Sequence, residues 1–240
     1  MRSLVLADIH ANLQALQAVL DDAAAAGGFD DVWCLGDIVG YGPQPSECIA
    51  RLRSLSLNAV SGNHDLAAAG AMGTEAFNPL AAEAALWTAE RLSAVEKAWL
   101  RELPQVSTVG EFTLTHGSLK DPAWEYLYSS AAAAAHLARQ ATDYGFVGHT
   151  HVPLVFFEAS RTLSPGAGEV LDLSGTRFVA NPGGVGQPRD GDPRAAYALV
   201  DSEARRIEFR RVAYDISATQ ARMRAAGLPE FLWRRLPQGR

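Results

Sequence analysis

The sequence predicts a mixed α/β fold with a metal site at the carboxyl ends of its strands. Short apolar segments alternate with helical patterns over residues 3–60, which indicates parallel strands joined by helical crossovers. Five apolar segments along the chain also end in residues that bind metals, and an open sheet gathers such strand ends along one crevice. These segments are LVLADIH, VWCLGD, NAVSGNHD, FTLTH and FVGHTH.

The N-terminal region predicts a βαβαβ arrangement. Apolar runs without alternation are typical of buried strands, and apolar residues at helical spacing between them predict the crossovers. Gly27 and Gly28 end the first helix, and the loop GDIVGYGPQP precedes the second. The expected elements are strands over 3–7, 32–35 and 57–60 and helices over 12–26 and 46–55.

The segment from 66 to 103 is rich in alanine and predicts a helical insertion beside the site. Pro79 interrupts the helical pattern, and Ser93 to Glu96 forms a capping-box motif. We read the alanine runs as helix-forming sequence without a separate function.

The remaining sequence predicts mostly antiparallel strands. Two strands flank Gly110 as a hairpin, and a helix over about 130–141 leads into a strand that ends at Gly148. A helical tail over about 217–236 closes the chain, and we expect one domain over residues 1–240. The charges in RRIEFRR favour a solvated edge strand over a nucleic-acid-binding patch. The later strand-like segments are PLVFFEA, EVLDLS, RFVAN, AAYALV and RIEFRRV.

The composition is that of an ordinary folded protein. Of 240 residues, 48% are hydrophobic and 20% are charged, which excludes wholesale disorder. The net charge of −6 argues against a stable nucleic-acid complex, although a metal cluster can attract phosphate locally. The apolar N-terminal stretch is broken by Asp8 and is too short for a signal peptide or membrane span, so we expect a cytoplasmic protein. Cys34 and Cys48 are expected to be packing residues.

The strand-end residues have the spacing of metal ligands. Asp8 and His10 are two residues apart, so in extended backbone both would point to one side and grip one ion. His149 and His151 have the same spacing but could instead serve two neighbouring ions, and Asp37 can bridge with both carboxylate oxygens. The candidate ligands are Asp8, His10, Asp37, Asn63, His116, His149 and His151.

This ligand set suits two divalent ions. Its two carboxylates contribute about −2 against about +4 from the ions, and a bridging hydroxide leaves about +1. Such a cluster attracts phosphate and lowers the pKa of water enough to supply a nucleophile near neutral pH. Oxygen and nitrogen ligands without thiolate favour manganese, with Fe, Zn, Ni, Co and Mg as alternatives. A single Asp or His at a strand end is often a helix cap or a satisfied core group, but five motifs in order favour the metal site.

The ordered motifs resemble the calcineurin-like metallophosphoesterase superfamily. Downstream, NPGGVGQPRDGDPRAAYALVD resembles a segment of its small bacterial and archaeal phosphodiesterase-like branch, as does GDIVGYGPQPSEC. The motifs are Asp8-x-His10, Gly36-Asp37, Gly62-Asn63-His64-Asp65, His116-Gly117 and Gly148-His149-Thr150-His151.

The resemblance implies a four-layer αββα sandwich, in which two mixed sheets lie between helices and carry a dinuclear metal site at one edge. It implies that Asp37 bridges the two ions. One ion would be held by Asp8, His10, Asp37 and His151, and the other by Asp37, Asn63, His116 and His149. His64 would lie over the substrate to stabilise or protonate the leaving oxygen, with Asp65 orienting its ring. The alternative for His64 is a structural role.

Four further residues are candidates for substrate contact: Asn12, Tyr41, Gln187 and Arg189. The Arg189 guanidinium matches a phosphate edge, and the alternative is a surface ion pair with Asp190 or Asp192. Tyr41, if exposed, could stack on a base. His136 is expected to be structural.

Two positions depart from the usual pattern of the branch. Ala11 stands where glycine usually follows the first histidine, and Gly184 stands where serine is usual. Neither departure removes a ligand, so both concern substrate fit and not metal binding.

We expect a metal-dependent phosphoesterase that cleaves a diester or phosphoanhydride of a small phosphorylated substrate, including nucleotides, with a metal-bridging hydroxide as nucleophile. One alternative is an asymmetric dinucleoside polyphosphate hydrolase. A Ser/Thr protein phosphatase is a second, but Asp65 and Leu66 follow His64 where such enzymes carry an arginine. A non-enzymatic scaffold is disfavoured because every ligand and His64 are present. The sequence does not determine the natural substrate, the native metal or the oligomeric state.

Overall fold

Apolar side chains on both faces of the first strand set up the layers of the fold. In β1 (Arg2–Leu6), Leu4 and Leu6 face helices, whereas Val5 faces a second sheet. A strand that is apolar on both faces must be covered on both, which is the arrangement expected for buried parallel strands. The computed structural model describes residues 1–159, 161–173 and 175–240.

The described strands form two mixed sheets. In the first sheet β1 pairs in parallel with β2 and antiparallel with β11, so Leu4 lies opposite both Val32 and Leu199. Its strand order is β3 (Leu57–Ala59), β2 (Asp31–Cys34), β1, β11 (Ala195–Asp201), β12 (Arg206–Val212) and β9 (Val170–Asp172). The second sheet has the order β4 (Val106–Val109), β5 (Phe112–Thr115), β6 (Tyr144–Phe146), β10 (Phe178–Asn181), β7 (Leu154–Phe157) and β8 (Thr162–Leu163).

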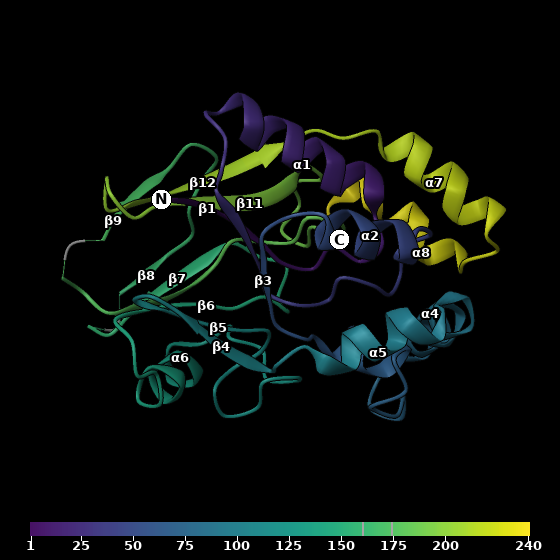
Figure 1. The fold of residues 1–240 in the computed structure, drawn as a ribbon, viewed down its shortest axis with the longest axis horizontal. Coiled ribbons are helices and arrows are strands. Elements are labelled where there is room, and N and C mark those ends of the chain that lie inside the picture. The colour runs from purple at the N-terminus through teal and green to yellow at the C-terminus, as the bar shows by residue number, and fades with distance from the viewer. Residues whose placement is uncertain (160, 174) are drawn as a thin grey trace.

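Helices cover the outer faces of both sheets. Figure 1 shows α1 above the first sheet and α6 below the second. In chain order, the first four helices are α1 (Leu13–Ala25), α2 (Pro45–Arg53), α3 (Asn63–Ala68) and α4 (Pro79–Arg91). The others are α5 (Ala94–Glu102), α6 (Ser130–Leu137), α7 (Ile216–Ala225), α8 (Glu230–Arg234) and a 3-10 turn at Leu236–Gln238. Two mixed sheets between helices confirm the predicted αββα fold.

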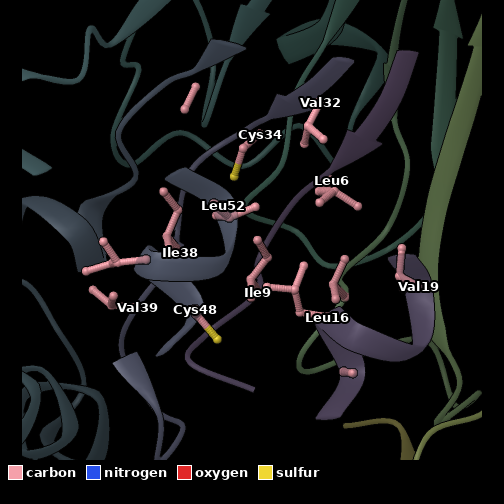
Figure 2. Packing of buried hydrophobic residues seen from close by; sticks show 14 of the residues in the cluster. Leu6, Ile9, Leu16, Val19, Val32, Cys34, Ile38, Val39, Cys48 and Leu52 are labelled. Atoms are coloured by element: carbon pink, nitrogen blue, oxygen red, sulfur yellow. The ribbon is translucent and has the colours of Figure 1, made fainter. Parts of the chain in front are cut away.

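Three buried clusters hold the four layers together. Phe146, Phe112 and Trp33 pack between the sheets, and Leu137 joins α6 to the second sheet. The third cluster joins the first sheet to α1 and α2, and it includes Leu6 and Leu16 (Figure 2). Cys34 and Cys48 are free thiols in this third cluster, in agreement with the packing role that we expected.

A fourth cluster joins α4 to the C-terminal helices. Met223, Leu228 and Leu232 pack with Ala81 and Ala84 of α4, and the Trp87 indole donates a hydrogen bond to the Ala226 carbonyl. Helix α4 and the C-terminal helices α7 and α8 are far apart in the sequence, and they pack together beside the edge of the sheets.

Most of the predicted elements are present, with boundaries that differ by a few residues. The hairpin around Gly110 and the Ser93–Glu96 capping box are confirmed. The edge-strand prediction for RRIEFRR is wrong over Arg206–Glu208, because this part of β12 lies between β11 and the short strand β9. Charged residues of β12 form ion pairs: Arg210 pairs with Asp22 of α1 and with Glu208 of the same strand. The assignment of one domain with a helical insertion stays a prediction.

None of the described helices has the length and apolar character needed to cross a membrane.

We expect the cluster between the sheets to dominate stability. Leu114 of β5 is fully buried there, and Leu114→Ala should lower the free energy of unfolding by about 2–5 kcal/mol because it leaves a cavity. Leu86 on α4 is 55% exposed, so the same substitution should change stability by about 0.5 kcal/mol or less. Guanidinium denaturation measures both. Equal losses would contradict this assignment of the core.

Candidate dinuclear metal centre

The ends of five parallel strands meet at one edge of the two sheets. Asp8 and His10 follow β1, and Asp37 follows β2. The segment after β3 enters α3, whose first two residues are Asn63 and His64. In the second sheet, His116 follows β5, and His149 and His151 follow β6. All eight predicted side chains are at most 4% exposed, so the fold brings them together in a buried site.

The backbone at these strand ends is left-handed. Asp8, His10, Asp37, His149 and His151 have φ angles between 51° and 66°, apart from 48° at His10. Residues other than glycine rarely adopt this conformation, and such strain is typical of functional sites. The prediction that Asp8 and His10 share a side through extended backbone is therefore wrong. They converge because the chain turns immediately after β1, where the His10 amide bonds to the Asp37 carbonyl.

The side chains form two groups that meet at Asp37. In the first, His151 Nε2 lies 3.2 Å from His10 Nε2 and 3.5 Å from Asp8 Oδ1. In the second, His116 Nε2 lies 3.0 Å from His149 Nδ1 and 3.3 Å from Asn63 Oδ1. Each group, together with Asp37 in the second, has ligand atoms close enough to hold one ion, and so does a third set of His10, Asp37 and His64. His149 and His151 thus belong to different groups, as the second of the two predicted arrangements requires.

Hydrogen bonds to carbonyl groups determine which imidazole nitrogens carry protons. His10 Nδ1 donates to the Val39 carbonyl, and His151 Nδ1 donates to the Gln187 carbonyl. His116 Nδ1 donates to Leu35, and His149 Nε2 donates to Trp124. The opposite nitrogen of the neutral His10, His149 and His151 rings must then present a lone pair.

These lone pairs converge on one another and on carboxylate oxygens, a repulsive arrangement that a cation between them would make favourable. Asp8 Oδ2 is also buried without a hydrogen-bond partner among the described residues. The donor set therefore fits a pair of divalent ions, and it contains nitrogen and oxygen ligands without thiolate.

Asp37 faces both groups through a single oxygen. Its Oδ2 lies 3.6 Å from His10 Nε2 and 3.4 Å from His116 Nε2. Its Oδ1 accepts a hydrogen bond from the His64 amide at 2.9 Å. Oδ2 alone faces both groups in this geometry, and bridging through both oxygens stays a prediction.

Burial and charge determine the proton balance of the site. Burial lowers the pKa of His10, His149 and His151, which keeps their rings neutral and available as ligands. Burial also raises the pKa of Asp8 to about 7. Burial opposes protonation of His116, but the Asp37 carboxylate overcomes it and raises the pKa of His116 to about 9. A divalent ion would take the place of this proton.

His64 lies beside the ligand groups with its ring against other rings. Tyr41 is 4.4 Å from it between centroids, and Phe77 is 4.9 Å away. Its Nδ1 is buried without a hydrogen-bond partner among the described residues, and burial lowers its pKa to about 4. Among the described residues the Asp65 carboxylate forms no hydrogen bond with the His64 ring. This carboxylate instead accepts hydrogen bonds from the Val39 and Gly62 amides, so it holds two ligand-bearing loops together.

A cavity of about 150 Å³ opens beside His64. Sequence reasoning missed three aromatic residues that line it: Phe77, Trp124 and Tyr126. The Tyr126 ring stacks on His149 with centroids 3.9 Å apart. The signal that would have found two of them is the Trp124-x-Tyr126 spacing in the loop that follows the His116 motif.

The four predicted substrate contacts occupy different places. Tyr41 and Arg189 line the cavity, although Tyr41 is only 6% exposed. Asn12 caps α1 and donates to the Gly186 carbonyl, and the Gln187 side-chain oxygen accepts from Arg189. Neither Asn12 nor Gln187 lines the cavity within the described residues. Substrate contact stays a prediction for all four.

The two departures from the branch pattern have different structural consequences. Ala11 has a φ of 52°, a conformation in which glycine is less strained. A Cβ atom at Gly184 would lie 3.0 Å from the His151 Cβ, so a serine there would require this ligand to shift. His136, by contrast, has the structural role expected of it, because its ring accepts the Leu119 amide and contacts Gln140.

The fold and the site together define a metallophosphoesterase. A family model described as the calcineurin-like phosphoesterase superfamily domain matches residues 1–205, and the chain belongs to this superfamily. It is 48% identical to a metallophosphoesterase from Sphaerobacter thermophilus, whose crystal structure superimposes with a TM-score of 0.91 and covers 100% of this chain and 99% of that one. It is 37% identical to an uncharacterized protein of Methanocaldococcus jannaschii, over 98% of this chain and 97% of that protein.

A further relative has a named activity. The symmetrical bis(5′-nucleosyl)-tetraphosphatase of Aromatoleum aromaticum is 32% identical over 142 residues, which are 56% of this chain and 48% of that protein. The protein is therefore a metal-dependent phosphoesterase, a hydrolase of phosphoric ester bonds that uses divalent metal.

Because the backbone at Ala11 is strained, an alanine-to-glycine substitution should have a different effect on stability there than inside a helix. Ala11→Gly should be neutral or stabilise the protein by up to about 1 kcal/mol, because glycine tolerates a left-handed backbone. Ala18→Gly, in the middle of α1, should destabilise it by about 1 kcal/mol. Thermal unfolding of the metal-free protein compares the two. An equal loss of stability would show that Ala11 is not strained.

Proposed function

We propose that the chain hydrolyses a phosphodiester or phosphoanhydride bond of a small nucleotide-like substrate with two divalent ions in the site. The observation that carries the proposal is the convergence of four buried imidazole rings on the Asp8 and Asp37 carboxylates beside a small cavity. When bound, two divalent ions stabilise charge on phosphoryl oxygens and lower the pKa of water.

Each buried ligand has a proposed place. Asp8, His10 and His151 hold one ion, and His116, His149 and Asn63 hold the other, with Asp37 shared by both. The carbonyl groups that accept hydrogen bonds from the four imidazoles fix the rings so that their lone pairs face the ions. Manganese is the first metal to test.

His64 is proposed to act on the substrate and not on a metal. Its ring lines the cavity, and it is neutral near pH 7 because burial lowers its pKa. A neutral imidazole can donate a hydrogen bond to the leaving oxygen of a phosphoryl group. Asp65 contributes indirectly, since it positions the loop before α3 and the loop after Asp37.

A nucleotide-like substrate is favoured by the aromatic lining of the cavity. Phe77, Trp124 and Tyr126 offer apolar ring surfaces beside the metal ligands, and Arg189 adds a positive charge that suits phosphate. The tetraphosphatase similarity supports a dinucleoside polyphosphate. This relative is a symmetrical enzyme, whereas the alternative considered from the sequence is an asymmetric one, and the products of diadenosine tetraphosphate distinguish the two.

A protein phosphatase and a non-enzymatic scaffold receive less support from the site. Asp65 and Leu66 follow His64, at the place where protein phosphatases of this superfamily carry an arginine. A scaffold without catalysis would not need a complete set of buried ligands with converging lone pairs, because such a site costs stability when it is empty.

Activity with and without metal tests the proposal. The protein should hydrolyse bis-p-nitrophenyl phosphate or diadenosine tetraphosphate with Mn²⁺ and lose this activity in a chelator. Asp37→Asn should lose both bound ions and the activity, because Asp37 Oδ2 faces both groups. Asp143→Asn, on an exposed side chain away from the site, is the matched control and should retain both. Absence of turnover with every divalent metal on both substrates would refute the proposal.

His64→Ala separates catalysis from metal binding. We expect kcat to fall by about 100-fold or more, the range for removing a group that assists proton transfer. Elemental analysis and calorimetry with Mn²⁺ should still find the wild-type number of ions, because His64 is not a proposed ligand. If the variant loses an ion, or if its kcat is unchanged, the assigned role is wrong.

A further inference from the structure

Two guanidinium groups near the metal centre share one acceptor. Arg189 and Arg235 both donate to Gln187 Oε1, Arg189 at 3.0 Å. They also lie near the same ring, with guanidinium carbons 5.8 Å and 5.0 Å from the centroid of Tyr41. Arg235 immediately follows α8, so a segment at the end of the chain adds a second positive charge to the loop that contains Arg189.

This pair differs from neighbouring arginines because it lacks a counter-charge. Arg194 pairs with Asp192, Arg211 pairs with Asp190, and Arg234 pairs with Glu230. In the described part of the chain, neither Arg189 nor Arg235 forms such an ion pair, so the surface ion pair considered for Arg189 is not observed. The Nε atoms of both are buried without a hydrogen-bond partner among the described residues.

Two like charges held together without a carboxylate are costly unless an anion neutralises them. Burial and the nearby Arg189 charge lower the pKa of Arg235 to about 10, which is a sign of that cost. Hydrogen bonds with Gln187 orient both groups but add no negative charge, so neither guanidinium has a carboxylate in direct contact among the described residues.

The pair is continuous with the catalytic cavity. Arg189 lines the same cavity as Asp37, His64 and His151, whereas Arg235 lies behind it against Tyr41 and Gln187. The Arg189 amide contacts the His151 carbonyl, and the Gln187 carbonyl accepts the His151 ring proton. An anion at Arg189 would therefore sit next to the metal ligands but apart from the lone pairs that hold the ions.

We propose that Arg189 and Arg235, joined through Gln187, form a subsite for a second phosphoryl group of the substrate. Arg189 contacts this group, and Arg235 is a positioning residue that acts through its charge and through Gln187. The subsite selects a phosphoanhydride chain over a simple diester, which carries one phosphoryl group only. The inference rests on the proposed function and deepens it by naming the substrate class.

Substrate selectivity tests this subsite. Arg235→Gln should reduce kcat/KM for diadenosine tetraphosphate about tenfold more than for bis-p-nitrophenyl phosphate, mainly through KM, since it removes charge-assisted binding. It should also weaken inhibition by tripolyphosphate about tenfold relative to inhibition by orthophosphate. Arg235→Lys retains the charge and should recover part of both effects, which a purely structural role would not predict.

The adjacent arginine provides a matched control. Arg234 is exposed and paired with Glu230, so Arg234→Gln should leave the kinetics of both substrates and the inhibition by tripolyphosphate unchanged. Equal losses on both substrates in Arg235→Gln, or no loss on either, would overturn the subsite.

The subsite and the proposed function can fail separately. If the wild type cleaves the diester but not the tetraphosphate, and tripolyphosphate inhibits no better than orthophosphate, the subsite is wrong and the phosphoesterase stands. If the wild type cleaves neither substrate, the proposed function fails, and calorimetry with tripolyphosphate still decides the subsite. Binding that is equal in the wild type and Arg235→Gln would then refute it.

Discussion

The structure depends on a concentration of imidazole nitrogen and carboxylate oxygen at buried strand ends. His10 and His151 point lone pairs at each other across 3.2 Å, and this contact makes sense when a cation lies between them. The strained backbone at Asp8, Asp37 and His149 is the cost of collecting these groups from several strand ends. Two packed sheets provide the rigidity that holds the strain, because their apolar faces leave the strand ends little freedom.

Beside the candidate metal ligands lies a second part of the structure, which we propose makes the site selective among substrates. The fourth apolar cluster joins α4 to the C-terminal helices and includes Tyr41, with Phe77 packed against it; Arg235 lies 5.0 Å from the centroid of the Tyr41 ring. The site is therefore assembled from the start, the middle and the end of the chain. The candidate metal ligands come from the strand ends, whereas we propose that Arg189 and Arg235 discriminate among phosphorylated substrates.

Local sequence patterns predicted the elements well and predicted their spatial relations less well. The Ser93–Glu96 capping box and the hairpin at Gly110 were predictable because their interactions lie within a few residues. The position of β12 inside its sheet was not, because it depends on pairing with β9, whose short apolar segment does not reveal its partner. Extended backbone at Asp8 was also a wrong inference, because only the contact with the β2 loop forces the left-handed turn.

From the sequence alone came the αββα fold, through the resemblance of its motifs, and the identity of the buried candidate ligands. These were predictable because each ligand directly follows an apolar strand, so the order of strands implies one shared edge. Tertiary structure decided that Asp37 faces both groups with one oxygen, that Asp65 braces loops, and that Arg235 joins Arg189. The physical reason is distance along the chain, because each of these contacts joins segments that no local sequence pattern links. Which buried polar groups must form hydrogen bonds or ion pairs with each other depends on how the segments pack.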